Sequence, residues 1–154
     1  MPSRFGALSN DNVGARLLRH AVELAFQVLD RDSQVVVLGA GEAAEGVLRS
    51  LHQQGASSVT LMNRHPEKAG VLASAWGARA GAWNELDETL AAADLLFVAT
   101  GSRTPVITAD QLSRVVEART RPNLMVVDLS IPRNVEPAAR LVRELVESSR
   151  RARV

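Results

Sequence analysis

The chain alternates between short apolar runs and longer stretches in which apolar residues recur at helical spacing. Short runs bounded by polar residues and glycine are typical of strands buried on both faces of a parallel sheet. These runs occupy residues 34–38, 59–62, 78–83, 94–99 and 124–127. Apolar residues at positions i, i+3, i+4 and i+7 indicate amphipathic helices. These stretches cover residues 11–29, 42–54, 66–77, 85–93, 109–118 and 138–150.

This alternation predicts an α/β fold with a doubly wound parallel sheet, because a helix is the usual connection between parallel strands. Right-handed crossovers and the common winding give about five strands in the order 3-2-1-4-5. The direction in which successive strands are added to the sheet then reverses between the first and fourth strands, which makes this the switch point. We expect the turns after those two strands to flank one crevice, with Asp128 after the fifth strand beside it.

The first helix is expected to begin at an Asn10 or Asp11 cap and to run to about Leu29, with residues 1–9 loose. Its apolar residues form one wide face that should pack against the sheet. They are Leu17, Leu18, Ala21, Val22, Leu24, Ala25, Val28 and Leu29.

Local signals also predict caps and inward faces for two later helices. Asn84 is a candidate cap for the helix at 85–93, and Thr108 is one for the helix that follows it. In the helix that begins near Pro66, the inward residues should be Val71, Leu72 and Ala75.

A glycine-rich turn, G-x-G-x-x-A, joins the first strand to the helix that follows. Gly39 allows the tight turn, Gly41 lets the backbone approach a pyrophosphate, and Ala44 allows close packing of the helix. The amides at the helix start point at the anion. This context predicts a dinucleotide site, and the alternative is the same turn without a ligand. The expected contacts here are Gly39, Ala40, Gly41, Glu42 and Ala43.

The end of the second strand indicates which dinucleotide binds. Enzymes that use NAD tend to carry an acid there, which holds the ribose 2′-hydroxyl. This chain has Asn63 and Arg64 instead, and a guanidinium can grip a 2′-phosphate and stack on adenine. The sequence therefore predicts NADP(H), with His65 also lining the pocket. The alternative is that Arg64 is an ordinary surface arginine.

Small polar residues follow the fourth strand. Thr100, Gly101 and Ser102 are interpreted as contacts to the ribose and nicotinamide, and a plain turn is the alternative. Asp128 could bind loop amides or a substrate, and a structural role is as plausible. The histidines show no metal spacing, and neither a metal ligand nor a catalytic residue is assigned.

Composition narrows the class of protein. The chain has 154 residues, a net charge of +1 and no cysteine, so it holds neither a disulfide nor a cysteine nucleophile. The weak net charge gives no indication of nucleic-acid binding, and no apolar run reaches the length of a membrane span. A cytoplasmic protein is expected.

Six motifs together resemble the NADPH-binding domain of glutamyl-tRNA reductase between His20 and about Pro137. They are His20 to Ala25, Val36 to Glu42, Asn63-Arg64, Ala99 to Ser102, Pro105 to Thr108, and Val127 to Pro137. The first three are shared with shikimate dehydrogenases, whereas the later ones are more particular to the reductase. The resemblance implies that eight of the residues named above bind NADPH: Gly39, Gly41, Glu42, Asn63, Arg64, Thr100, Gly101 and Ser102. In the family, a preceding domain supplies a cysteine that forms a thioester, which NADPH reduces to an aldehyde in tetrapyrrole synthesis.

The chain departs from this family pattern in several ways. It has no cysteine, His65 stands where the family often has threonine, and residues after Pro137 follow no family motif. We expect a leading helix in residues 1–33, an NADP(H)-binding Rossmann domain in 34–137 and a basic amphipathic helix in 138–154.

Three functions remain open from the sequence. The first is an NADP(H)-binding domain that acts with a separate cysteine-bearing catalytic subunit, and a homodimer is plausible. The second is a non-catalytic nucleotide-binding module. The third is a small dehydrogenase of shikimate type, which would need a Lys/Asp pair; Lys68, the single lysine, lies far from the expected nicotinamide end.

Overall fold

The computed structural model describes residues 2–100, 106–121 and 123–129, and for residues 2–13 it describes the backbone alone. Five strands form one parallel sheet in the order β3-β2-β1-β4-β5. Their bounds are Val35–Leu38 (β1), Val59–Met62 (β2), Arg79–Gly81 (β3), Leu95–Val98 (β4) and Met125–Asp128 (β5). The predicted fold class and strand order are confirmed.

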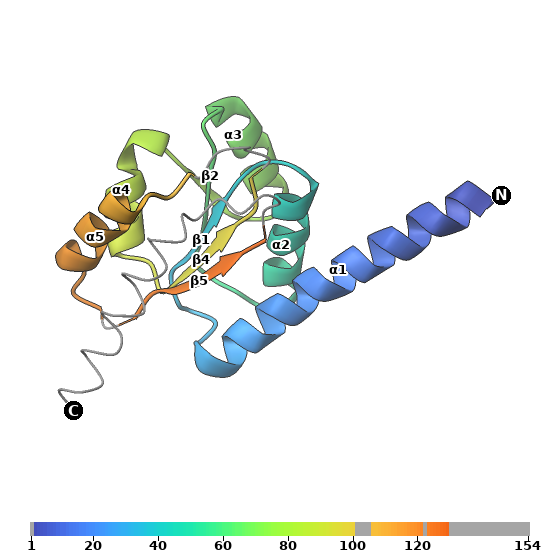
Figure 1. Cartoon of the computed structure of the whole chain (residues 1–154), viewed down its shortest axis with the longest axis horizontal. Helices are drawn as coiled ribbons and strands as arrows, with labels where there is room; N and C mark the ends of the chain where they lie inside the picture. The colour runs from blue at the N-terminus through green and yellow to red at the C-terminus, as the bar shows by residue number, and fades with distance from the viewer. Residues whose placement is uncertain (1, 101–105, 122, 130–154) are drawn as a thin grey trace.

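Helices cover both faces of the sheet (Figure 1). Their bounds are Pro2–Val28 (α1), Glu42–Gln53 (α2), Pro66–Ala75 (α3), Leu86–Ala91 (α4) and Ala109–Ala118 (α5), and a 3-10 turn, η1, spans Trp83–Glu85. Along β1, Val35 and Val37 face the core shared with α1, α2 and α3, whereas Val36 and Leu38 face the core shared with α4 and α5. All four are buried, as a central parallel strand requires.

Helix α1 starts earlier than the sequence indicated, at Pro2 rather than at Asn10 or Asp11. Proline fits the first helical turn because its missing N–H would have no acceptor within the helix. The N-terminal part of α1 extends beyond the body of the domain, while its C-terminal part lies against α2 (Figure 1).

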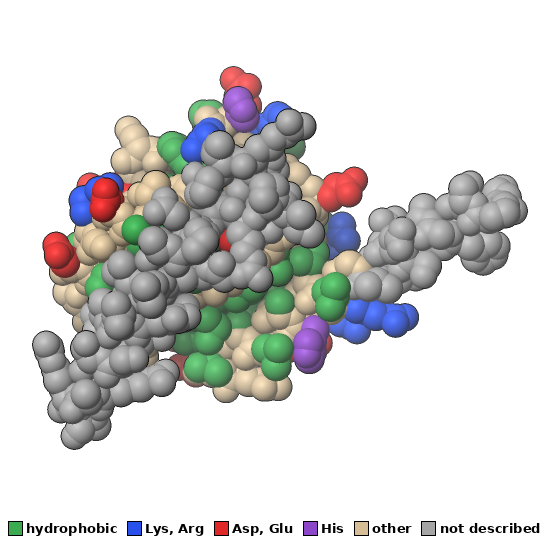
Figure 2. All heavy atoms as spheres, in the orientation of Figure 1, with side chains coloured by type: hydrophobic (Ala, Val, Ile, Leu, Met, Phe, Trp, Pro, Cys, Tyr) green, Lys and Arg blue, Asp and Glu red, His purple; other side chains and the backbone are tan. Residues whose placement is uncertain are grey.

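The buried face of α1 is narrower than predicted. Val22 and Ala25 are buried as expected, together with Phe26, but Leu17 and Val28 are 64% and 73% exposed. The reason is that α1 packs at the side of α2 as well as on the sheet, so a single stripe of the helix faces the core. Figure 2 shows hydrophobic side chains gathered on the surface near the C-terminal end of α1.

One further helix face was predicted only in part, and one predicted cap was wrong. In α3 the partly buried Leu72 packs against the core as expected, but the fully buried residues are Ala69 and Ala73, which lie one turn apart, and Val71 is 75% exposed. The small alanines let α3 approach the sheet closely. Asn84 lies within η1 and does not cap α4, since the turn carries the chain directly into that helix.

The Thr108 cap is confirmed, because its hydroxyl oxygen accepts a 3.1 Å hydrogen bond from the backbone N–H of Gln111.

A buried arginine supports the edge of the sheet where the strands begin. Arg119 follows α5, and its guanidinium donates hydrogen bonds to the carbonyl oxygens of Leu90, Ala93 and Asn123 at 2.9, 2.6 and 2.7 Å. These carbonyls belong to the end of α4 and to the segments that lead into β4 and β5. The sequence analysis did not single out this residue.

The part of the chain described by the structure contains no helix long and apolar enough to cross a bilayer. The expected helix at 138–150 lies outside the described residues.

Candidate functional site

The carboxyl ends of the strands meet at one edge of the sheet. In the registers, Leu38 lies opposite both Met62 and Val98, and Val98 lies opposite Asp128. The turns that follow β1, β2, β4 and β5 therefore start side by side. Open α/β sheets bind their ligands at this edge. The predicted site residues all follow these neighbouring strand ends, so they lie at the edge where a ligand is expected.

The glycine turn and the segment after β4 are in direct contact. Gly39 is buried with a φ of +125°, and a Cβ added to it would lie 2.3 Å from the carbonyl oxygen of Ala99. The N–H of Gly39 donates to the Met62 carbonyl at 3.0 Å, and the N–H of Ala99 donates to the Leu38 carbonyl at 2.8 Å. The expected adjacency of the two turns is confirmed.

The start of α2 presents an open backbone surface. Gly41 is the N-cap, it is exposed, and a Cβ added to it would meet nothing within 4 Å. The first N–H with an intrahelical acceptor belongs to Glu45, which donates to the Gly41 carbonyl at 3.0 Å. The amides of residues 42–44 have no such acceptor and can receive an anion.

The side chains near the start of α2 are compatible with a ligand bound to the backbone amides there. Ala44 is fully buried, as the third position of the motif requires for close packing. Ala40 and Ala43 are half-buried, while Glu42 is exposed and extends from the first helical turn. No large side chain in this turn fills the space above the amides.

The segment after β2 lies at the same edge. The side-chain Nδ2 atom of Asn63 donates a hydrogen bond to the backbone carbonyl of His65 at 3.4 Å, and His65 is the exposed N-cap of α3. Arg64 is also exposed, and its guanidinium carbon lies 5.4 Å from the centroid of the Trp83 ring. The sequence analysis missed Trp83, although its position just after a strand adjacent to β2 was a usable signal.

Only part of the predicted nicotinamide end lies within the described residues. Thr100 is half-buried directly after β4, whereas Gly101 and Ser102 fall outside the described part of the chain. Asp128 ends β5 and is half-buried, and the next residue, Leu129, donates its N–H to the Val98 carbonyl at 2.8 Å.

The other two histidines lie away from this edge. His20 is in α1, where its Nδ1 lies 3.8 Å from a carboxylate oxygen of Glu23. The ring of His52 packs edge-on against Trp76 with centroids 6.0 Å apart. Both contacts account for these histidines without a role in binding a nucleotide.

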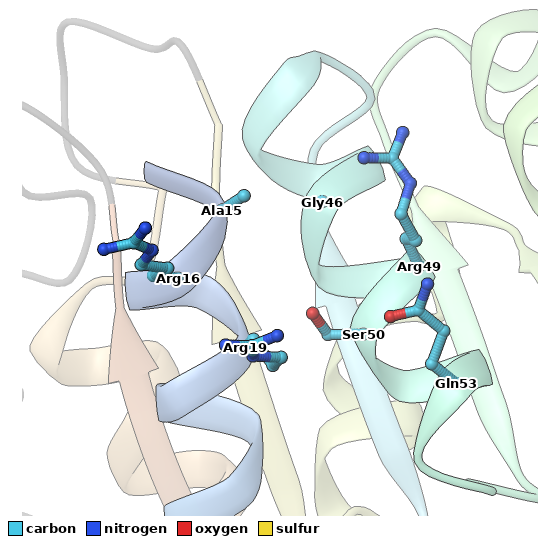
Figure 3. Close-up of a pocket in the computed structure, with 7 residues that line it drawn as sticks. All are labelled: Ala15, Arg16, Arg19, Gly46, Arg49, Ser50 and Gln53. Carbon is cyan, nitrogen blue, oxygen red and sulfur yellow. The ribbon is translucent and has the colours of Figure 1, made fainter. Parts of the chain in front are cut away.

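A cavity of about 380 Å³ lies between α1 and α2, and none of the predicted site residues lines it (Figure 3). Its lining includes Arg16, Arg19, Arg49 and Ser50. In Figure 3 the guanidinium groups of Arg16 and Arg49 point away from each other. This cavity therefore does not bring those two cations together on one ligand.

A family model described as Shikimate / quinate 5-dehydrogenase matches residues 23–147. The match extends from α1 through the whole described sheet. The chain belongs to this family. The edge of the sheet described above is therefore compared with members of this family.

Glutamyl-tRNA reductases are among the similar proteins. The chain is 38% identical to that of Halalkalibacterium halodurans over 120 residues, which is 77% of this chain and 26% of the relative. The structure of the Methanopyrus kandleri reductase superposes with a TM-score of 0.71 and 32% identity, covering 86% of this chain and 37% of that one. The nucleotide-binding domain of the Thermoplasma volcanium reductase has the same fold, with a TM-score of 0.61, 17% identity and coverages of 91% and 95%.

These similarities confirm the resemblance to the nucleotide-binding domain of glutamyl-tRNA reductase. The chain spans about a quarter of the length of the curated relatives, 26% in the case above, so it corresponds to one part of those enzymes. The fold and the family support a Rossmann-type NAD(P)-binding domain of an oxidoreductase. Which side chains contact the nucleotide stays a prediction.

Proposed function

We propose that the chain binds NADP(H) and is the hydride-donor domain of an oxidoreductase of glutamyl-tRNA reductase type. The observation that carries this proposal is Arg64, which stands at the end of β2 where an NAD-binding domain tends to have an acid. Among the described residues, no carboxylate oxygen lies within 4.0 Å of the Arg64 guanidinium. Its donors are therefore available to a phosphate.

The chain's own residues would bind and orient the nucleotide. The amides at the start of α2 would receive the pyrophosphate, since Gly41 leaves that surface open. Asn63 and Arg64 would hold the adenosine end and its 2′-phosphate, with His65 beside them. Thr100, Gly101 and Ser102 would contact the ribose and nicotinamide. When bound, NADPH supplies the hydride.

The group that receives the substrate has to come from elsewhere. None of the 154 residues is a cysteine, so this chain cannot form the thioester that the reductase family uses. We infer that a cysteine-bearing domain or subunit acts with this one and presents glutamyl-tRNA. The product would be the glutamate semialdehyde that enters tetrapyrrole biosynthesis.

Titration of the purified chain with NADPH and NADH tests the cofactor. We expect NADPH to bind more tightly, and Arg64→Ala to lose about 10- to 100-fold in NADPH affinity because a charged hydrogen bond is removed. Arg31→Ala is a matched control, since the Arg31 guanidinium also lies over an aromatic ring, 4.9 Å from the centroid of Phe26, but follows α1 at the opposite edge. Equal affinities for the two cofactors would refute the proposal.

The family match favours one second candidate, a small dehydrogenase of shikimate type. Such an enzyme needs a lysine near the nicotinamide, and the single lysine, Lys68, is exposed in α3. We therefore expect the isolated chain to reduce no NADP⁺ with shikimate or quinate. Measurable turnover that Lys68→Ala removes would establish this second function instead.

A further inference from the structure

The segments after β2 and β3 bring an arginine and a tryptophan together. Met62 and Gly81 lie opposite each other in the parallel register, so Arg64 and Trp83 both lie two residues past paired strand ends. The guanidinium carbon of Arg64 lies over the Trp83 ring, 5.4 Å from its centroid. This separation is within the range of a cation–π interaction.

Trp83 is the fixed partner of this pair. Its side chain is half-buried and packs against the core under α4 and α5, while Arg64 is exposed. The backbone leading to Trp83 also packs closely on β2, because a Cβ at Gly81 would lie 3.0 Å from the Thr60 Cγ2 atom and 3.1 Å from the Met62 Cγ atom. The ring thus provides a packed surface for a long, exposed side chain.

The stacking leaves the recognition groups of Arg64 available. A guanidinium has two flat faces and an edge that carries five N–H donors. The guanidinium carbon lies over the Trp83 ring, and no described carboxylate oxygen lies within 4.0 Å of the guanidinium nitrogens. The N–H edge and the side of the guanidinium away from the ring remain for a phosphate and a purine ring, the two groups that a 2′-phosphoadenosine presents together.

We propose that Trp83 is a positioning residue for the nucleotide: its ring holds the Arg64 guanidinium flat, so that the guanidinium edge binds the 2′-phosphate and its free face stacks on adenine. The proposal rests on the proposed function and adds to it a residue that selects between cofactors through Arg64. The order of the stack is Trp83, Arg64, adenine. Removing the ring therefore weakens binding of 2′-phosphorylated nucleotides more than binding of nucleotides without that phosphate, which lose only the adenine stack.

Binding of NADPH, NADH and 2′,5′-ADP to Trp83→Leu tests the inference. We expect NADPH and 2′,5′-ADP to bind about two- to fivefold more weakly than to the unaltered chain, and the affinity for NADH to fall less than the affinity for NADPH. Trp83→Phe, which keeps an aromatic face, should recover most of the affinity. In an Arg64→Ala background, Trp83→Leu should have no further effect, because the residue acts through Arg64.

The chain offers a matched control and a spectroscopic signal. Trp76 carries Arg49 over its ring at 5.3 Å, in a pair that joins α2 to the end of α3. Trp76→Leu should leave cofactor discrimination unchanged. In a Trp76→Phe variant Trp83 is the single tryptophan, and 2′,5′-ADP should change its fluorescence.

Four outcomes separate this inference from the proposed function. If Arg64→Ala weakens NADPH binding but Trp83→Leu does not, the positioning role is overturned and the function stands. The positioning role is also overturned if Trp83→Leu weakens binding of NADPH and NADH equally. It is likewise overturned if Trp83→Leu has its full effect in the Arg64→Ala background. If the unaltered chain does not distinguish the two cofactors, both fail.

Discussion

The backbone of Gly39 lies against the end of β4, so that a Cβ added to Gly39 would stand 2.3 Å from the carbonyl oxygen of Ala99. This contact fixes the turn after β1 to the segment that leads into Thr100. Two parts of the candidate site that are far apart in the sequence are therefore held together by main-chain packing.

Gly39→Ala should destabilise the fold. The native φ of +125° is unfavourable for any residue with a Cβ, and the added carbon would also displace the Ala99 backbone. We expect a loss of about 2–4 kcal/mol in the free energy of unfolding. Urea denaturation followed by circular dichroism measures it. An unchanged midpoint would show that β4 can move away from the turn at little cost.

Gly41→Ala should instead affect binding. Its φ is −96° and a Cβ would meet nothing within 4 Å, so the fold should lose less than about 1 kcal/mol. The methyl group would occupy the surface expected to receive the pyrophosphate, and NADPH affinity should fall at least tenfold, which is about 1.4 kcal/mol.

Gly70→Ala serves as the control for this comparison. Gly70 lies inside α3 and also has open space for a Cβ. The substitution should stabilise the helix by about 1 kcal/mol and leave NADPH affinity unchanged. Full NADPH affinity in Gly41→Ala would place the pyrophosphate away from the start of α2.

Arg119→Met should destabilise the chain without affecting the nucleotide site. Arg119 is 8% exposed, and its guanidinium donates hydrogen bonds to backbone carbonyl groups at the edge of the sheet opposite the candidate site. Loss of these charged hydrogen bonds should cost about 2–4 kcal/mol. Arg114→Met, at an exposed arginine in α5, should change stability by less than about 0.5 kcal/mol. Thermal unfolding of both variants, with NADPH titration, distinguishes the two cases.

The strand pattern was predictable because buried parallel strands leave short, continuous apolar runs. β2 has the predicted bounds, β1 differs by one residue at its start, and β4 differs by one residue at each end. The order of the strands followed from right-handed crossovers together with the common winding of this fold class. The same rules brought Gly39 and Thr100 to one edge, so the position of the candidate site also came from the sequence.

Helix faces and polar contacts were less predictable because they depend on neighbours far along the chain. Leu17 and Val28 have helical spacing but remain exposed, since α1 packs at the side of α2. Arg119 resembles a surface arginine in the sequence, and its burial depends on where α4 ends. Trp83 meets Arg64 only once the register of β2 and β3 is known.

Gly46 lies in α2 at the surface where α1 packs against that helix. A Cβ at this position would lie 2.5 Å from the Cδ1 atom of Leu18, the end of a flexible side chain. Gly46→Ala therefore has two opposed effects. Alanine favours the helix by about 1 kcal/mol, whereas the clash with Leu18 opposes docking of α1.

A double-mutant cycle separates these two effects. Alone, Gly46→Ala should leave the unfolding free energy unchanged or lower it, and amide exchange in α1 should become faster. In a Leu18→Ala background the clash is gone, so the same substitution should stabilise the chain by about 1 kcal/mol. If Gly46→Ala stabilises both backgrounds equally, then Leu18 moves aside freely and the contact between α1 and α2 does not depend on a small residue at position 46.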